Sequence, residues 1–393
     1  RYEKINHLQD EDAVYAGHSF WYYIVETYGE SVIPDILLLS KYERKVAAGF
    51  LNVLGLKLKE LSYDWYGFYV SMFDDPLNEI VVPETPPVIK RPKKDRVYTQ
   101  LKQDPTGRYL TFVTNHDGKF KLFLLDKETG KKKKIYQKGN KLDQIVDYSN
   151  PVIAWHPTGM LFAFILENEG TLNLFYYTID EEELIVRNLV QYDKILSFAF
   201  SDKGNQIVFS AVKDGKSDIF LFNVASSSSQ QITNDLADDK YPRFVQNSSA
   251  IVFSSNRYTN SISAETERKE MGFSFRNFIY RIQQGNDHLI EMDDEAYENY
   301  KMIYPSQQKN EFISLSDYSG IRNRYITEFD STIGYIDTAI HYRYVANHFA
   351  NSTFNRNILE HDYNPTAGKV AEIFYKDGRH HLYQHDINTN DKV

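Results

Sequence analysis

The sequence contains no cysteine, so a disulfide, a thiolate zinc site and a cysteine nucleophile are all excluded within this chain. It also lacks any run of about 18 apolar residues, the length that a membrane-spanning helix requires. The stretch from Arg1 to Lys4 leads directly into polar sequence, where a secretory leader would place an apolar segment. We therefore expect a mature, cleaved or partial product without a transmembrane segment.

Basic residues are in deficit. The 45 Lys and Arg residues face 54 Asp and Glu residues, which gives a formal net charge of −9. A protein that binds nucleic acid regardless of sequence needs a basic face to displace counterions, so we expect no nucleic-acid partner. The basic cluster Lys90–Lys94 is typical of a solvated charge run in a linker.

Aromatic residues are abundant instead, with 30 Tyr and 25 Phe among 393 residues. Aromatic-rich sequence that is punctuated by glycine favours β structure. A chain of this length exceeds one compact core and suits several domains, or a repeat domain with an appendage. The 42% of hydrophobic residues and 25% of charged residues exclude a disordered chain.

Three regions follow one another along the chain. Residues 1–73 carry apolar residues at three- and four-residue spacing, which predicts a small all-α segment of four short helices. Residues 74–97 contain five prolines and predict an extended, semi-rigid linker. Over residues 98–393 the apolar pattern changes to period two, which predicts β-strands.

The β region repeats. In its first three units a turn glycine is followed 11 residues later by a second one: Gly107 and Gly118, Gly159 and Gly170, Gly204 and Gly215. Weaker copies bring the number to six units of about 49 residues each. Each unit has the strands of one small antiparallel sheet, and such sheets bury both faces when they form a ring. The prediction is a mainly β protein with a six-bladed β-propeller; a seventh blade, or an open ring that ends at Val393, is the structural alternative.

The third unit carries the most complete motif. It runs through Phe200–Gly204, Ile207–Ser210, Asp214-Gly215, Asp218–Phe220 and Gln231–Thr233. This pattern resembles the TolB-type, WD40-like (PD40) propeller repeat, and the resemblance covers about three quarters of the chain. It implies a TolB-like propeller, but proteins with this repeat include envelope scaffolds, peptidase gatekeeper domains and binding modules.

The helical segment Tyr15–Gly29 is similar to a stretch that follows the active site in gluzincin-type metallopeptidase domains. Those enzymes hold zinc with H-E-x-x-H on one helix, and this sequence contains no His-Glu pair. The resemblance therefore implies that a zinc helix would lie upstream of Arg1. Together, such a tail and a tyrosine-rich propeller resemble large cell-envelope proteins of Bacteroidota-type Gram-negative bacteria, which implies a periplasmic, outer-membrane or cell-surface location.

No catalytic, cofactor or metal residue is assigned. Ser19 lacks the G-x-S-x-G elbow of a hydrolase. His380 and His381, near His385, would point to opposite faces of a strand. Two groups of acidic residues could bind Ca²⁺, but they lack the EF-hand spacing. The favoured interpretation is that they are polar residues of loops between blades. The first group is Asp235, Asp238 and Asp239, and the second is Glu291, Asp293, Asp294 and Glu295.

One loop segment combines arginine with aromatic residues, the types that most often anchor protein interfaces. Propeller loops are positioned by a rigid frame around a central channel. The candidate partner-binding residues are Tyr318, Arg322, Arg324 and Tyr325.

Four functions remain open at this point. The first is a non-catalytic propeller scaffold that binds other cell-envelope proteins, as an accessory subunit of an outer-membrane or periplasmic complex. The alternative is the propeller and tail portion of a zinc metallopeptidase whose H-E-x-x-H helix lies upstream of this chain. The third is the N-terminal propeller of a prolyl-oligopeptidase-type enzyme, which would need a hydrolase domain downstream. The fourth is a carbohydrate-binding propeller.

Overall fold

The computed structural model describes residues 10–73, 80–141, 146–168, 170–257, 259–262, 271–283, 288–292, 299–337, 340–389 and 391–392. The chain divides into two compact units, Arg1–Glu79 and Ile80–Val393. The boundary falls within the proline-rich stretch 74–97, so its residues from Ile80 onward belong to the second unit. Each unit is described by itself.

The first unit is helical. It consists of α1 (Asp10–Tyr28), α2 (Val32–Glu43), α3 (Val46–Leu54) and α4 (Leu58–Phe73). Each helix turns an apolar stripe inward, because residues three and four apart share one face. The buried core is largely aromatic and comprises Phe20, Tyr23, Ile24, Ile36, Phe50, Leu61 and Trp65. The predicted N-terminal all-α segment is confirmed, and none of the described helices is long and apolar enough to cross a membrane.

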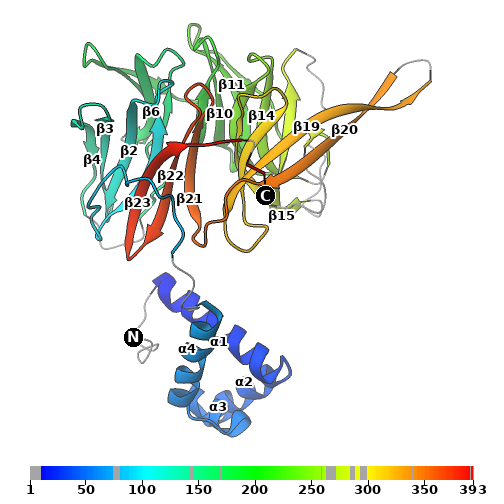
Figure 1. Ribbon diagram of the computed structural model, residues 1–393. Coiled ribbons are helices and arrows are strands. Elements are labelled where there is room, and N and C mark those ends of the chain that lie inside the picture. The colour runs from blue at the N-terminus through cyan, green and yellow to red at the C-terminus, as the bar shows by residue number, and fades with distance from the viewer. Residues whose placement is uncertain are drawn as a thin grey trace. The chain divides into compact units, whose positions relative to one another are not determined.

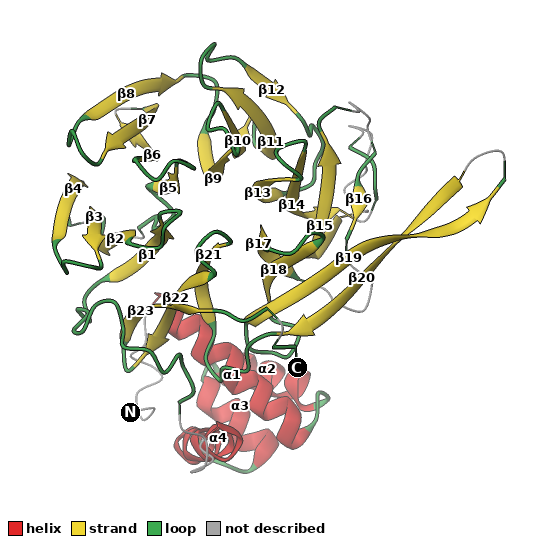
Figure 2. Cartoon of the chain, turned by 45° about the horizontal axis from the view of Figure 1, so that its top comes forward, coloured by secondary structure: helices red, strands yellow, loops and turns green. Residues whose placement is uncertain are grey.

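The second unit is a six-bladed β-propeller, as predicted. Figure 2 shows six antiparallel sheets around a central channel, with β1, β5, β9, β13, β17 and β21 innermost. Blades one to three contain β1 (Val97–Gln103), β2 (Tyr109–His116), β3 (Lys119–Asp126) and β4 (Lys132–Lys138); β5 (Val152–Trp155), β6 (Leu161–Asn168), β7 (Thr171–Thr178) and β8 (Leu184–Leu189); and β9 (Lys194–Phe200), β10 (Gln206–Lys213), β11 (Lys216–Asn223) and β12 (Ser229–Gln231). Blades four to six contain β13 (Asp239–Val245), β14 (Ala250–Arg257), β15 (Met271–Arg281) and β16 (Ile290–Glu291); β17 (Tyr300–Pro305), β18 (Glu311–Ser316), β19 (Asn323–Ile336) and β20 (Ile340–Ala350); and β21 (Ile358–Asn364), β22 (Lys369–Lys376) and β23 (Arg379–Asp386).

Glycine sets the repeated turns. Gly107, Gly159 and Gly204 all have φ near +70°, in the left-handed region that residues with a Cβ rarely adopt. At Gly204 the neighbouring blade adds a second reason, because a Cβ there would collide with the ring of His156. The regular turns therefore fix both the hairpins and the close approach of blade two to blade three.

The ring closes within the described residues, because blade six packs against blade one. The carboxylate of Asp362 on β21 accepts a hydrogen bond from the backbone N–H of Gln103 on β1 at 3.0 Å. In the described part of the chain blade six has three strands, and the chain entering the propeller lies beside its outer edge. There the Val88 N–H donates to the Leu382 carbonyl at 2.7 Å, and Val88 and Ile89 pack on the core shared by blades one and six.

Blade five departs from the other blades. Its third and fourth strands, β19 and β20, extend as a two-stranded arm away from the ring (Figures 1 and 2). Strand β18 pairs with β19 only as far as Glu328, whereas β19 and β20 remain paired as far as Ile336 and Ile340. We call residues 330–337 and 340–345 the blade-five arm.

Candidate functional site

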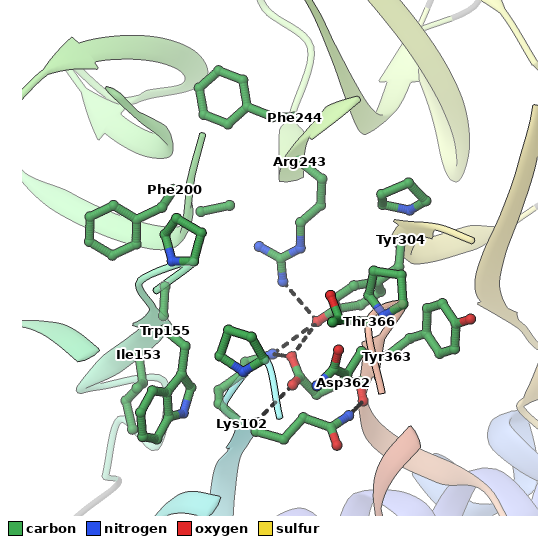
Figure 3. A pocket seen from close by; sticks show the side chains of 18 of the residues that line it. Lys102, Ile153, Trp155, Phe200, Arg243, Phe244, Tyr304, Asp362, Tyr363 and Thr366 are labelled. Carbon is green, nitrogen blue, oxygen red and sulfur yellow. Dashed lines mark hydrogen bonds and ion pairs between the residues drawn. The ribbon is translucent and has the colours of Figure 1, made fainter. Parts of the chain in front are cut away.

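A cavity of about 250 Å³ lies at the end of the channel where the inner strands finish. The inner strands of all six blades contribute to its lining. Figure 3 shows that Lys102, Arg243, Tyr304 and Asp362 bring their polar groups together there. These four residues come from blades one, four, five and six, so the site exists only in the assembled ring.

A repeated backbone irregularity places three of these side chains. Lys102, Arg243 and Tyr304 each begin the pairing that resumes after a register shift in their inner strand. In each case the residue two positions earlier has a positive φ of 53° to 57°; these residues are Gln100, Tyr241 and Met302. Such bulges re-aim the side chains that follow them. The same device therefore turns one polar side chain from each of three blades toward the channel.

Tyr304 is the centre of the polar network. Its hydroxyl accepts hydrogen bonds from Lys102 Nζ at 3.0 Å and from an Arg243 Nη atom at 2.8 Å. It donates to Asp362 Oδ1, at 3.0 Å. The guanidinium carbon of Arg243 also lies 4.5 Å from the centroid of the Tyr304 ring, a favourable position for a cation.

Charge is unevenly balanced in this network. Lys102 forms an ion pair with Asp362, with Nζ and Oδ1 3.0 Å apart. Burial lowers the pKa of Lys102, but the charge of Asp362 and the contact with Tyr304 outweigh it, so the net shift is upward. No ion pair of Arg243 is recorded among the residues that the structure describes; its Nη1 donates to the Phe198 carbonyl at 3.2 Å.

Part of the cavity wall is apolar. Trp155 and Phe200 form part of one side (Figure 3). Proline ends the inner strand or lies one or two residues beyond it in four blades, and it also lines the cavity; these residues are Pro105, Pro157, Pro305 and Pro365. The cavity thus combines an apolar wall with a cationic group, as ligand sites commonly do.

The predicted partner-binding residues lie elsewhere. They follow β18, whose last residue Ser316 pairs with Tyr300 at the start of β17, so the segment lies at the channel end opposite the cavity. Tyr318 is 59% exposed and Arg322 is half-buried near Asp317. Arg324 and Tyr325 are buried, and Arg324 forms an ion pair with Glu372 of blade six. Partner binding by this segment stays a prediction, and only Tyr318 and Arg322 offer it accessible surface.

The interpretation of the first acidic group as loop polarity is wrong for two residues. Asp235 and Asp239 are buried, and Arg257 forms ion pairs with them at 2.8 and 2.7 Å. The buried carboxylate of Asp218 lies close to both. Sequence reasoning missed Asp218 and Arg257 as members of this cluster, which joins blade three to blade four. Of the second group, Asp293, Asp294 and Glu295 lie outside the described residues.

The cavity itself was also missed by sequence reasoning, because its residues stand one to a blade and form no local motif. One signal was present: Pro242 interrupts an otherwise strand-like stretch, and proline inside a strand marks a bulge or an edge.

His380 and His381 are half-buried neighbours on β23. The zinc helix expected upstream of Arg1 stays a prediction.

The fold and cavity define the second unit as a six-bladed β-propeller with a polar central network. No family model and no curated protein matches the chain. Solved structures with a similar fold include TolB from Acinetobacter baumannii, with 13% identity, 84% of this chain and 70% of that chain covered and a TM-score of 0.45. Putative TolB from Agrobacterium tumefaciens is 14% identical over 75% of this chain and 91% of that chain, also with a TM-score of 0.45. The β-propeller domain of the Trilobed protease from Pyrococcus furiosus is 12% identical over 76% and 98%, with a TM-score of 0.45. Likeness at this level says nothing about what this chain binds.

Proposed function

We propose that this chain is a non-catalytic β-propeller scaffold of a large cell-envelope protein, located in the periplasm, at the outer membrane or at the cell surface. It binds other envelope proteins as an accessory part of a complex, and the blade-five arm is the element that engages a partner. The observation that supports this proposal most directly is the exposure of large apolar side chains on the arm.

The side chains at the tip of the arm bury little of their surface. Ile333, Ile336 and Tyr342 are 57%, 66% and 59% exposed, and every residue of β19 from Asp330 onward is exposed. A two-stranded hairpin without a third strand or a core is only marginally stable in water. Exposed apolar clusters on such an element are typical of a protein contact.

The base of the arm is firmly held. Phe329 and Tyr344 stack with ring centroids 5.4 Å apart, and both belong to the core that blade five shares with blade four. Arg281, at the end of β15, donates a hydrogen bond to the Tyr344 hydroxyl at 3.1 Å. The arm is therefore presented in a defined direction, which lowers the entropy cost of binding.

The backbone of the arm suggests how a partner binds. Strand β20 is the outermost strand of its sheet, and among the described residues no strand pairs with its outer edge. An open edge accepts an extended segment of another protein by main-chain hydrogen bonds. Ile333 and Tyr342 are directly opposite each other, so both side chains lie on one face and can contact the same partner.

The test compares two double variants of the full chain. In I333K/Y342K both apolar side chains of the arm pair become charged, while in the control L184K/V186K the same change is made at two exposed apolar positions of β8 in blade two. Each immobilised protein is exposed to a native cell-envelope extract, and retained proteins are identified and quantified. We expect envelope proteins in fixed ratio on the unchanged chain and the control, and their loss on the arm variant.

Equal retention by all three proteins would remove the arm from the proposal. Absence of envelope partners on the intact folded chain would count against the scaffold function as a whole. Light scattering of the purified chain adds one distinction: a doubled mass that I333K/Y342K abolishes would assign the arm to self-assembly.

A further inference from the structure

We infer that the channel cavity is a binding site for a carboxylate that is attached to an apolar group, with the guanidinium of Arg243 as its anchor. This site is separate from the blade-five arm and does not depend on the function proposed for it. The carboxylate could belong to the free C-terminus of a peptide or to a small organic acid, since both present the same chemistry.

The charge in the cavity carries the inference. Two cations and one carboxylate meet at Tyr304, and the carboxylate of Asp362 is engaged by Lys102. Arg243 reaches the centre of the site (Figure 3), where its guanidinium lies over the ring of Tyr304. Glu360, the next carboxyl along β21, does not line the cavity. Its side chain accepts the Gln100 N–H at 2.7 Å, and burial raises its pKa.

The donors of Arg243 suit a carboxylate. The recorded hydrogen bonds go from Nη1 to the carbonyls of Phe198 and Pro242 and from Nη2 to Tyr304. A guanidinium carries five N–H groups in one plane, and a carboxylate can accept two of them side by side. A doubly charged phosphate would need further cations, whereas Lys102 is already paired with Asp362.

The size and walls of the cavity define the rest of the ligand. Its volume of about 250 Å³ is below the range of about 300–1,000 Å³ typical for drug-sized ligands. A chain end or a small acid fits such a space, while a folded partner could enter only by one terminal group. Trp155 and Phe200 on one side, with Pro157 in the turn after β5, offer an apolar surface to a side chain beside the carboxylate.

The test measures binding to the full chain by isothermal titration calorimetry. The probes are N-acetyl-glycyl-phenylalanine with a free carboxyl group, the same peptide as its C-terminal amide, and phenylacetate. We expect at least one of the two acids to bind about tenfold or more tightly than the amide, because a charge-assisted hydrogen bond is lost in the amide. Tighter binding of the peptide acid would identify a chain terminus as the source, and tighter binding of phenylacetate a small acid.

Two variants locate the interaction. R243Q removes the charge in the cavity, and we expect it to lower the affinity for the better acid about tenfold or more. R356Q makes the same change at an exposed arginine outside the cavity and should bind like the unchanged chain. Equal affinity of the amide and the better-binding acid, no binding of either acid at millimolar concentration, or normal binding by folded R243Q would each overturn the inference. The comparison of acid with amide needs no variant, so it decides the matter even if R243Q fails to fold.

Discussion

Blades three and five are built on the same plan and differ in where their apolar side chains go. In blade three, β11 has eight residues. The neighbouring strand β10 buries Ile207 and Phe209 completely. In blade five, β19 has 14 residues, and the additional length leads to Ile333 and Ile336 in solvent. The repeat motif is nearly complete in blade three and weak in blade five. Departure from the repeat in blade five thus accompanies exposed apolar surface, while adherence to it in blade three accompanies a buried core.

The frame and the arm should respond differently to mutation. A side chain that joins two blades is desolvated in the folded state, so its loss leaves its partners without compensation. A side chain on the arm is already in water and has little to lose. The three predictions below test this contrast, from the largest expected change in stability to the smallest.

The largest effect is expected at the junction of blades three and four. R257A removes the only cation recorded in contact with Asp235 and Asp239 among the described residues, and leaves two buried carboxylates unpaired. Breaking a buried ion pair in this way costs about 3–5 kcal/mol, and we expect that decrease in the free energy of unfolding measured with urea.

The matched control for this prediction is R108A in blade one. Arg108 also binds a carboxylate, Asp126, at 2.8 Å, but its side chain is 38% exposed. Removal of an exposed pair costs about 0.2–1 kcal/mol. Similar losses for R257A and R108A would show that burial of the blade junction does not determine stability.

The second prediction concerns the pH dependence of the same junction. Burial, followed by the charge of Asp239, raises the pKa of Asp218 to about 7. The unfolded chain has the ordinary aspartate pKa of about 3.9, so the folded state binds more protons between about pH 4 and pH 7. The contribution of Asp218 to stability therefore decreases as the pH rises through this window and is constant above it.

D218N isolates this contribution. Asn has nearly the same shape but does not ionise; its amide oxygen can accept from Gln231 while its amide NH₂ group donates to the Thr233 hydroxyl. The free energy of unfolding of D218N relative to the unchanged chain should rise from pH 4 to pH 7, by at most about 1.4 kcal/mol per pH unit for one proton. A difference that is the same at pH 4.5 and pH 7.5 would contradict the prediction.

The contrast between blades also explains what the sequence could predict. Glycine pairs such as Gly204 and Gly215 report the backbone directly, because hairpin turns require the positive φ that both residues have. From them the number of blades and the order of strands could be predicted, as could the four helices from their apolar spacing. The bulge before Lys102 could not, because Gln100 adopts a positive φ without the glycine that would signal it. The cavity depends on six strands that meet only in the closed ring, and Arg257 contacts Asp235 across 22 residues.

The smallest effect on stability is expected on the blade-five arm. I333A/Y342A removes two large side chains that are more than half exposed, and little apolar surface is newly exposed to water. We expect the free energy of unfolding to change by less than about 0.5 kcal/mol. Phe209→Ala in blade three removes a side chain with no exposed surface and should cost about 3–5 kcal/mol. If I333A/Y342A were as destabilising as F209A, the arm would be part of the frame, and its exposed side chains would no longer mark a binding surface. If stability is unchanged while retention of envelope proteins falls, these side chains serve an interaction outside this chain.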